Sequence, residues 1–345
     1  MAIKKIPVDE AVGMVIPHDL TEIVAGGKKG PAFKKGHIIQ EQDIPKLKAI
    51  GKNHIFVIEI NEDELHENDA AKLMAKAIAG EGIVYDNEPV EGKINFYAAC
   101  DGLLLVDVEA LFNFNKLGEV ILSTRHTHTV VKKGEALAGC RAIPLVAKKD
   151  IVNKAVDIAK SCEGILKIAS WKIRKASIVI TGQEVYEGRI KDAFGPVLTK
   201  KLKGFGVEVL SISIVPDDQD RISSAIKEAV DKGAELIITT GGMSVDPDDV
   251  TRIGIKNAGA KDIVYGSPVL PGSMFLIAYI NDNIPIIGLP ACGMYFKTTV
   301  LDLVLPRVLV GERFNRDKIA ALGHGGFCLN CKKCTFPICP FGKGV

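Results

Sequence analysis

The chain has 345 residues, of which 47% are hydrophobic and 25% are charged, and its formal net charge is +2. This composition supports the cores of two or three domains, and it excludes global disorder and the strongly basic surface typical of nucleic-acid-binding proteins. No run of about 18 apolar residues predicts a membrane span, and the first residues lack the apolar segment of a signal peptide. We therefore expect a cytoplasmic protein without nucleic-acid or membrane partners.

Residues 1–165 predict an amino-terminal α+β region. Helices are expected at 43–50, 68–80 and 150–160. Short apolar segments between glycine turns predict strands at 55–60, 102–108, 119–122, 129–132 and 141–146. We place the boundary to the next domain between residues 161 and 175.

Residues 174–312 alternate strands and helices, which predicts an α/β fold with a doubly wound, mostly parallel sheet. The segments expected as strands are 177–181, 207–215, 236–240, 263–264, 275–280 and 285–289. The segments expected as helices are 195–205, 219–232 and 293–310. Because such sheets bind ligands outside the carboxyl ends of their strands, the loops after these strands are candidate binding loops.

The loop over residues 239–251, with the sequence TTGGMSVDPDDVT, carries the strongest functional signal. It follows a short apolar run that reads as a buried parallel strand. Its hydroxyls and two glycines allow backbone amides to approach a phosphate closely. Three aspartates a few residues later suit a hard divalent cation such as Mg²⁺. The loop therefore predicts a site for an anionic ligand with a metal ion.

Five short motifs follow one another in this second domain. They are TGQEV at 181–185, VPDD at 215–218, the loop at 239–251, LPG at 270–272 and GLP at 288–290. With these motifs, residues 174–312 resemble the molybdopterin-binding domain of gephyrin and of the bacterial enzymes of molybdenum cofactor biosynthesis. The segments VDEAVG at 8–13, HDLT at 18–21 and KKGH at 34–37 resemble the amino-terminal part of the molybdopterin molybdenumtransferase branch.

The resemblance implies that the chain binds molybdopterin or its adenylate, hydrolyses the adenylate and inserts molybdate with Mg²⁺. Asp217, Asp218 and Asp249 would be the catalytic carboxylates, which would bind Mg²⁺ on the phosphate or polarise a reacting hydroxyl. The residues expected to bind the cofactor are Glu184, Thr239, Thr240, Gly241, Gly242, Ser244, Asp246, Pro271, Gly272, Gly288, Leu289 and Pro290. By the same resemblance, the chain would form a homodimer.

Two motifs depart from the transferase branch. Ser273 and Met274 stand where the branch has Lys-Pro, and Ala291, Cys292 and Gly293 stand where it has Gly-Asn-Pro. These changes favour a second hypothesis, a non-catalytic protein that binds, delivers or senses molybdopterin, whereas the retained carboxylates favour an enzyme. A nucleotide hydrolase of the competence-damage type is a third hypothesis, which the amino-terminal resemblance disfavours.

Four of the eight cysteines lie in the last eighteen residues. Cys328, Cys331, Cys334 and Cys339 have the spacing Cys-x2-Cys-x2-Cys-x4-Cys-Pro, which is one residue longer than the bacterial ferredoxin run. Such tight spacing suits an iron–sulfur cluster or a tetrahedral Zn²⁺, and the spacing does not distinguish them. We therefore expect residues 316–345 to form a metal-binding tail, with a disordered tail of free thiols as the alternative. Under the second hypothesis this tail would dock on, or sense, a redox partner, and a molybdoenzyme is the other expected partner.

Overall fold

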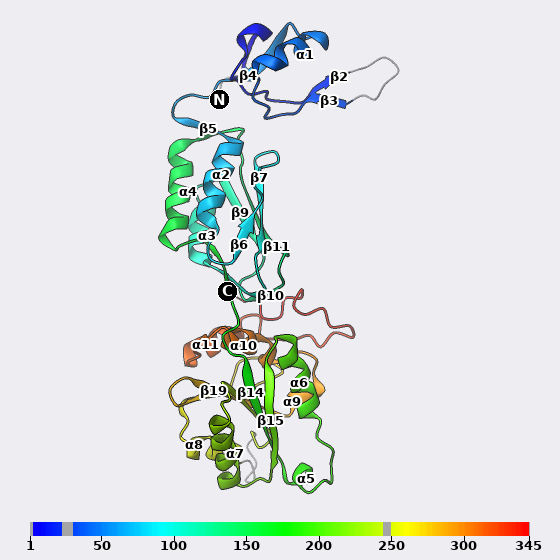
Figure 1. Cartoon of the computed structure of the whole chain (residues 1–345), viewed down its shortest axis with the longest axis vertical. Helices are drawn as coiled ribbons and strands as arrows, with labels where there is room; N and C mark the ends of the chain where they lie inside the picture. Colours follow the sequence, from blue (N-terminus) through cyan, green and yellow to red (C-terminus); the bar gives the residue numbers. More distant parts are fainter. Residues whose placement is uncertain (1–2, 23–29, 244–249, 345) are drawn as a thin grey trace. The chain divides into compact units, whose positions relative to one another are not determined.

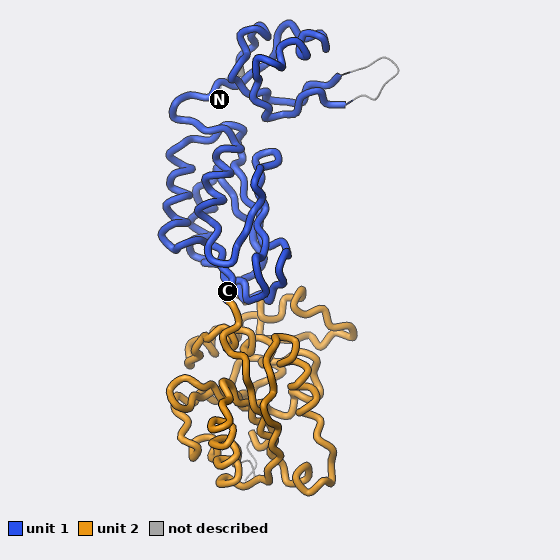
Figure 2. Tube along the Cα trace, viewed as in Figure 1, with its two compact units in different colours: residues 1–169 blue, residues 170–345 orange. Residues whose placement is uncertain are grey.

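The computed structural model describes residues 3–22, 30–243 and 250–344. The chain divides into two compact units, Met1–Ala169 and Ser170–Val345, which Figure 2 shows in different colours. Each unit has its own sheets and its own hydrophobic core. None of the described helices combines the length and the apolar character that a membrane crossing requires.

Unit 1 begins with two antiparallel strand pairs, β1 with β4 and β2 with β3 (Figure 1). The elements are β1 (Ile3–Pro7), η1 (Val8–Glu10), β2 (Leu20–Glu22), β3 (Gly30–Phe33), η2 (Glu41–Asp43), α1 (Ile44–Ala49) and β4 (His54–Ile58). Leu47 of α1 is fully buried in a core with Val8, Ile16, Ile39 and Val57. This small core explains why the short α1 is stable, because helices of this length depend on tertiary packing.

The remainder of unit 1 contains helices and three antiparallel sheets, with strand orders β6-β7-β11-β9, β10-β8-β13 and β12-β5. The elements are β5 (Glu64–His66), α2 (Glu67–Ile78), β6 (Ile83–Tyr85), β7 (Lys93–Ala98), β8 (Gly102–Val106), α3 (Val108–Asn115), β9 (Val120–Thr124), β10 (Thr129–Val131), β11 (Ala136–Ala142), β12 (Val146–Lys148), α4 (Lys149–Ser161) and β13 (Leu166–Ala169). Met74 of α2, Phe96 of β7 and Val152 of α4 are fully buried in one shared core.

The strand expected at 102–108 is wrong at its end, because α3 already begins at Val108. Asp107 accepts a hydrogen bond from the amide of Ala110 at 2.9 Å and so caps the helix. The helix residues include valine, phenylalanine and asparagine, which are weak helix formers, and the apolar run therefore reads as a continued strand. The cap and the packing of Phe114 decide the helix instead.

Glu67, the first residue of α2, is a carboxylate buried in unit 1. Only 4% of its side chain is exposed, and its Oε2 lies 3.5 Å from Arg141 Nη2. A Cβ at Gly36 or at Gly92 would lie 2.7 Å from one of its carboxylate oxygens, so both glycines leave room for this side chain. Burial raises the pKa of Glu67 above its ordinary value of 4.5, although the charge of Arg141 acts in the opposite direction.

We expect Glu67→Gln to flatten the pH dependence of stability. The folded chain keeps the Glu67 proton to a higher pH than the unfolded chain does. The stabilisation of the folded state by this protonation is therefore full below pH 4.5 and is lost as pH rises through the folded-state pKa of Glu67. The variant should therefore gain stability relative to the wild type between acidic and neutral pH. Urea unfolding of both chains across this pH range measures the difference in stability, and the variant Glu109→Gln, at an exposed position, is the control. Identical pH profiles for wild type and variant would contradict the assignment.

Unit 2 contains one six-stranded sheet with the order β15-β14-β16-β19-β18-β17. The elements are β14 (Lys175–Thr181), α5 (Gln183–Tyr186), α6 (Phe194–Gly204), β15 (Glu208–Val215), α7 (Gln219–Asp231), β16 (Leu236–Thr240), α8 (Thr251–Asn257), β17 (Lys261–Tyr265), β18 (Leu276–Ile280), β19 (Ile284–Leu289), α9 (Cys292–Tyr295), α10 (Val300–Leu309), α11 (Arg316–Ala320) and η3 (Ala321–Gly323). The first four strands in this order are parallel to one another. Strand β18 pairs antiparallel with β19, and β17 pairs antiparallel with β18. The predicted mostly parallel α/β sheet is confirmed.

Helices cover both faces of this sheet, as a doubly wound fold requires. On one face, Ile222 of α7 and Ile255 of α8 share a buried cluster with Val179 of β14 and Ile237 of β16. Neighbouring residues of a strand point to opposite faces, so Ile180 belongs to the other face, where Gly195 of α6 approaches its side chain. The strands are therefore buried on both faces and read as continuous apolar runs.

The helix expected at 293–310 is wrong in one respect, since the structure has two helices, α9 and α10, in its place. The break lies at Phe296, whose backbone is extended. Thr299 then caps α10, because its hydroxyl accepts from the amide of Leu301 at 3.2 Å. The carboxylate of Asp302 in turn accepts from the amide of Thr299 at 2.8 Å. This reciprocal cap starts a new helix inside the apolar segment.

Candidate functional site

The loops after β14 and β16 lie at the point where the strand order of the sheet reverses. The chain runs from β14 to β15 on one side and then to β16 on the other side of β14. Thr239 pairs with Val179 of β14 and with Gly288 of β19, so the carboxyl ends of these three parallel strands lie at one edge. Ligands of doubly wound folds bind at such a reversal point. Three of the predicted motifs therefore come together here.

Three threonines join the elements around this edge. The hydroxyl of Thr181, at the end of β14, donates to the carbonyl of Thr240 at 2.9 Å and lies 2.9 Å from the hydroxyl of Thr251. All three residues are buried. Because the proton of Thr181 is used by the carbonyl, Thr251 is the donor between the two hydroxyls. These bonds hold the first residue of α8 against the ends of two strands.

Gly241 and Gly242 follow β16 with positive φ values of +83° and +53°. A Cβ at Gly241 would come closer than 3.0 Å to the carbonyl oxygen of Thr181, and a Cβ at Gly242 would come equally close to the hydroxyl of Thr251. Only glycine combines this backbone conformation with so close an approach. The predicted glycine loop is thus packed directly on the threonine contacts.

Four of the predicted ligand-binding residues lie deeper inside the sheet than that role suggests. They are Thr239, Thr240, Gly288 and Leu289. Thr239 donates to the carbonyl of Ile287 at 3.4 Å, and Leu289 is 1% exposed. The hydroxyl of Thr240 is buried and has no hydrogen-bond partner among the described residues. A Cβ at Gly288 would overlap Met243, so this glycine makes room for the loop.

Asp217 and Asp218, two described carboxylates of the predicted site, bind backbone amides. Asp217 is half-buried, and its Oδ2 accepts from the amide of Gln183 at 2.8 Å, which fixes the start of α5. Asp218 is exposed and caps α7, because its Oδ1 accepts from the amides of Asp220 at 3.0 Å and Arg221 at 2.8 Å. Glu184 is exposed in α5.

Three further predicted residues, Ser244, Asp246 and Asp249, lie outside the described residues. Of the predicted carboxylate ligands for Mg²⁺, the described part of the chain holds Asp217 and Asp218. Within residues 3–22, 30–243 and 250–344, no group of three or more His, Cys, Asp or Glu side chains is arranged to hold a metal ion. The described carboxylates therefore do not form a complete ligand set for Mg²⁺.

The predicted residues Pro271 and Gly272 lie against the first residue of α10. The carbonyl of Pro271 accepts from the amide of Val300 at 3.1 Å. A Cβ at Gly272, whose φ is +135°, would overlap the side chain of Val300. Pro290, at the end of β19, accepts from the amide of Gly293 at 3.0 Å and so forms the turn into α9.

Two side chains near the loop were not predicted from the sequence. Tyr265 of β17 donates its hydroxyl to the carbonyl of Met243 at 2.8 Å. The guanidinium of Arg252 lies 4.4 Å from the centre of the Tyr265 ring. Arg252 follows the loop directly and was recognisable as a cation next to it. No local sequence pattern indicated Tyr265, because its contact with Met243 depends on the register of the strands at the edge of the sheet.

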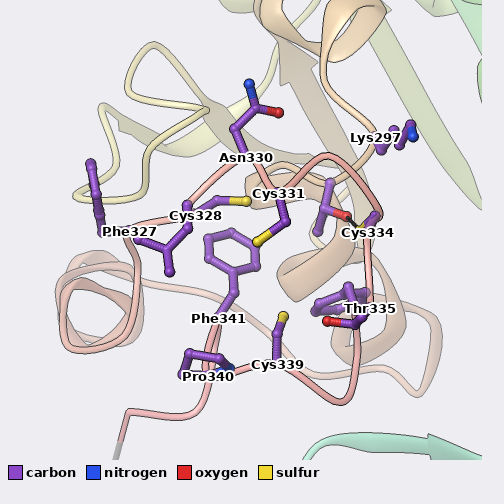
Figure 3. Close-up of a pocket in the computed structure, with 13 residues that line it drawn as sticks. Lys297, Phe327, Cys328, Asn330, Cys331, Cys334, Thr335, Cys339, Pro340 and Phe341 are labelled. Atoms are coloured by element: carbon purple, nitrogen blue, oxygen red, sulfur yellow. Dashed lines mark hydrogen bonds between the residues drawn. The ribbon is translucent and has the colours of Figure 1, made fainter.

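The predicted cysteines Cys328, Cys331, Cys334 and Cys339 line one small pocket (Figure 3). The hydroxyl of Thr298 lies 3.3 Å from the sulfur of Cys334 and holds the pKa of that thiol below its ordinary value. The structure thus brings together four cysteines that the spacing had grouped.

Fold and site define a doubly wound α/β ligand-binding domain with a glycine loop at its reversal point. Residues 177–309 match the family model described as a probable molybdopterin binding domain, and residues 5–59 match a domain of unknown function, DUF8806. Residues 177–309 therefore form a domain of the molybdopterin-binding kind that this model describes. The predicted molybdopterin-binding domain is confirmed.

Two curated relatives show the range of this similarity. A CinA-like protein of Mycobacterium avium is 40% identical over 95 residues, which are 28% of this chain and 22% of that protein. A molybdopterin molybdenumtransferase of Synechococcus elongatus is 25% identical over 160 residues, which are 44% of this chain and 39% of that protein. The chain thus spans well under half of the length of both relatives.

Solved structures of the same kind were found as well. The molybdopterin biosynthesis Mog protein of Mycobacterium ulcerans is 25% identical, with a TM-score of 0.34, and the match covers 43% of this chain and 99% of that one. The molybdopterin biosynthesis protein moea of Pyrococcus horikosii is 15% identical, with a TM-score of 0.33, and the match covers 90% of this chain and 75% of that one.

Proposed function

We propose that unit 2 binds molybdopterin or its adenylate at the edge formed by β14, β16 and β19. The observation that carries the proposal is the match of residues 177–309 to the molybdopterin-binding domain model. The backbone amides that follow β16 would hold the phosphate, since Gly241 and Gly242 keep side chains away from them. The other proposed ligand-binding residues are Glu184, Ser244, Asp246, Pro271, Gly272, Gly288, Leu289 and Pro290.

We further propose that the chain is an enzyme of the molybdenumtransferase kind. It would hydrolyse adenylylated molybdopterin to AMP and molybdopterin and insert molybdate into the dithiolene. Asp217, Asp218 and Asp249 are the proposed catalytic carboxylates, and one oxygen of Asp218 is already engaged in the cap of α7. Mg²⁺ would neutralise charge on the phosphate.

Asp249→Ala is expected to reduce AMP release from adenylylated molybdopterin by at least tenfold while the fold remains intact. A general acid–base group contributes roughly 10²–10⁴-fold to a rate, so the loss should be readily measured. The assay combines the purified chain with adenylylated molybdopterin, Mg²⁺ and molybdate, and follows AMP and protein-bound molybdenum. Asp157→Ala, an exposed aspartate of α4, is the control. Unchanged turnover of Asp249→Ala would refute the catalytic assignment.

The same assay separates the other two functions. Ser273 is exposed at the position where the transferase branch has lysine, which favours a binding or delivery protein. Pterin retained by the chain without AMP release would support that function. The names of the relatives, which include CinA-like and competence-damage inducible proteins, favour a nucleotide hydrolase instead. Hydrolysis of ADP-ribose, added as an alternative substrate, would support it.

A further inference from the structure

The four cysteines of the tail surround a single pocket of unit 2 (Figure 3). In Figure 3 the ring of Phe341 lies among the side chains of Cys328, Cys331 and Cys339. All four thiols are free of disulfide bonds. Four unmodified thiols that face one pocket provide the donor atoms that thiophilic metals prefer.

The segment that carries these cysteines is a loop closed at both ends. Phe327 forms a parallel bridge with Leu270, and the amide of Cys328 donates to the carbonyl of Leu270 at 2.8 Å. At the far end, the amide of Gly342 donates to the carbonyl of Gly325 at 2.9 Å. The cysteines are therefore held in one place by backbone contacts outside the cysteine run.

Within the loop, little apolar surface is buried. Phe327, Leu329 and Ile338 are 67%, 68% and 90% exposed, whereas Phe341 is 3% exposed. Residues 328–341 contain neither helix nor strand. A segment without a hydrophobic core or regular hydrogen bonding needs another source of stability, and small protein units of this kind commonly obtain it from disulfides or a structural metal. The free thiols leave the metal as the candidate.

We propose that Cys328, Cys331, Cys334 and Cys339 bind one metal centre, Zn²⁺ or an iron–sulfur cluster, through their thiolates. Each thiol releases its proton when it binds the metal. The resulting negative charge would be offset by Lys297, which lines the pocket, and by the neighbouring Lys332 and Lys333.

The sulfurs line the pocket but are not yet arranged as a ligand set among the described residues. Metal binding would therefore draw them together, which the irregular backbone of residues 328–341 allows. The centre would lie next to Leu270 and so beside the Pro271–Gly272 motif of unit 2. It would thus fasten the tail to one of the loops proposed to bind the pterin, although metal binding itself does not depend on the proposed function.

The test is metal analysis of the full chain purified without oxygen, together with its visible spectrum. One zinc per chain without colour identifies a zinc site, and iron with acid-labile sulfide and a broad visible absorbance identifies a cluster. Metal-stripped protein is reconstituted with Zn²⁺ alone or with Fe²⁺ and sulfide. We expect Cys331→Ser and Cys334→Ser to lower the bound metal at least tenfold. Cys162→Ser, which removes a thiol of unit 1, should retain it.

Hydrogen exchange provides a second measurement if the serine variants fold poorly. In the wild type, the amides of residues 326–342 should exchange more slowly with metal than without it, while those of unit 1 should not change. The proposal is overturned if neither reconstitution loads the wild type, or if Cys331→Ser binds metal as the wild type does. It is also overturned if intact mass shows the four cysteines joined in two disulfides.

Discussion

Gly241→Ala is expected to lower the free energy of unfolding by about 3 kcal/mol and to abolish measurable molybdopterin binding. The positive φ of +83° costs a residue with a side chain about 1–2 kcal/mol. The larger part of the loss arises because the new Cβ would overlap the carbonyl oxygen of Thr181, a backbone atom in a buried strand that cannot move aside. The glycine loop would then be displaced from the edge of the sheet.

Gly233→Ala is a matched control for this variant. Gly233 has nearly the same φ, +85°, but a Cβ there would meet no atom within 4 Å. We expect it to cost about 1 kcal/mol and to leave ligand binding unchanged. Urea unfolding and titration calorimetry with molybdopterin measure the two effects. Equal stability of the two variants would show that the close approach to Thr181 does not exist in solution.

Thr181→Val is expected to destabilise unit 2 by about 2 kcal/mol and to weaken pterin binding at least tenfold. Valine preserves the shape of threonine but removes the hydroxyl that bonds Thr240 and Thr251. The carbonyl of Thr240 and the hydroxyl of Thr251 would remain buried without this partner. The start of α8 would no longer be fastened to the end of β14, and the loop between β16 and α8 would lose its anchor.

Thr199→Val separates the lost hydrogen bonds from the substitution itself. The hydroxyl of Thr199 in α6 is buried, and it has no hydrogen-bond partner among the described residues. Removing it should leave stability unchanged or slightly higher, since no bond is lost. Thermal unfolding and pterin binding of both variants make the comparison. A loss in Thr199→Val as large as that in Thr181→Val would mean that the hydroxyl contacts are not the cause.

Local sequence patterns predicted most of the sheet in unit 2. Its strands are short apolar runs bounded by turns, and burial on both faces makes such runs easy to recognise. The break between α9 and α10 was missed, although Thr299 and Asp302 form a cap there. The apolar residues on both sides of the cap continue a helical pattern, and nothing local shows that the backbone of Phe296 is extended.

The roles of the candidate site residues were harder to predict than their positions. Asp217 and Asp218 are neighbours in the sequence, yet one binds the amide of Gln183 and the other caps α7. A carboxylate that follows a strand suits either use, and only the path of the chain after it decides. The contact of Cys328 was also not predictable from local sequence, because its amide donates to the carbonyl of Leu270, a residue far away in the chain.

The sequence by itself determined the α/β class of unit 2, the order of its strands, and the motifs that follow the strands. These properties depend on the periodicity of apolar residues and on turn residues, which act over a few positions. Only the tertiary structure decided that Thr181 and Thr251 meet, that Gly241 packs on a strand end, and that four cysteines face one pocket. Such contacts join distant segments, and they depend on sheet register and packing rather than on local preference.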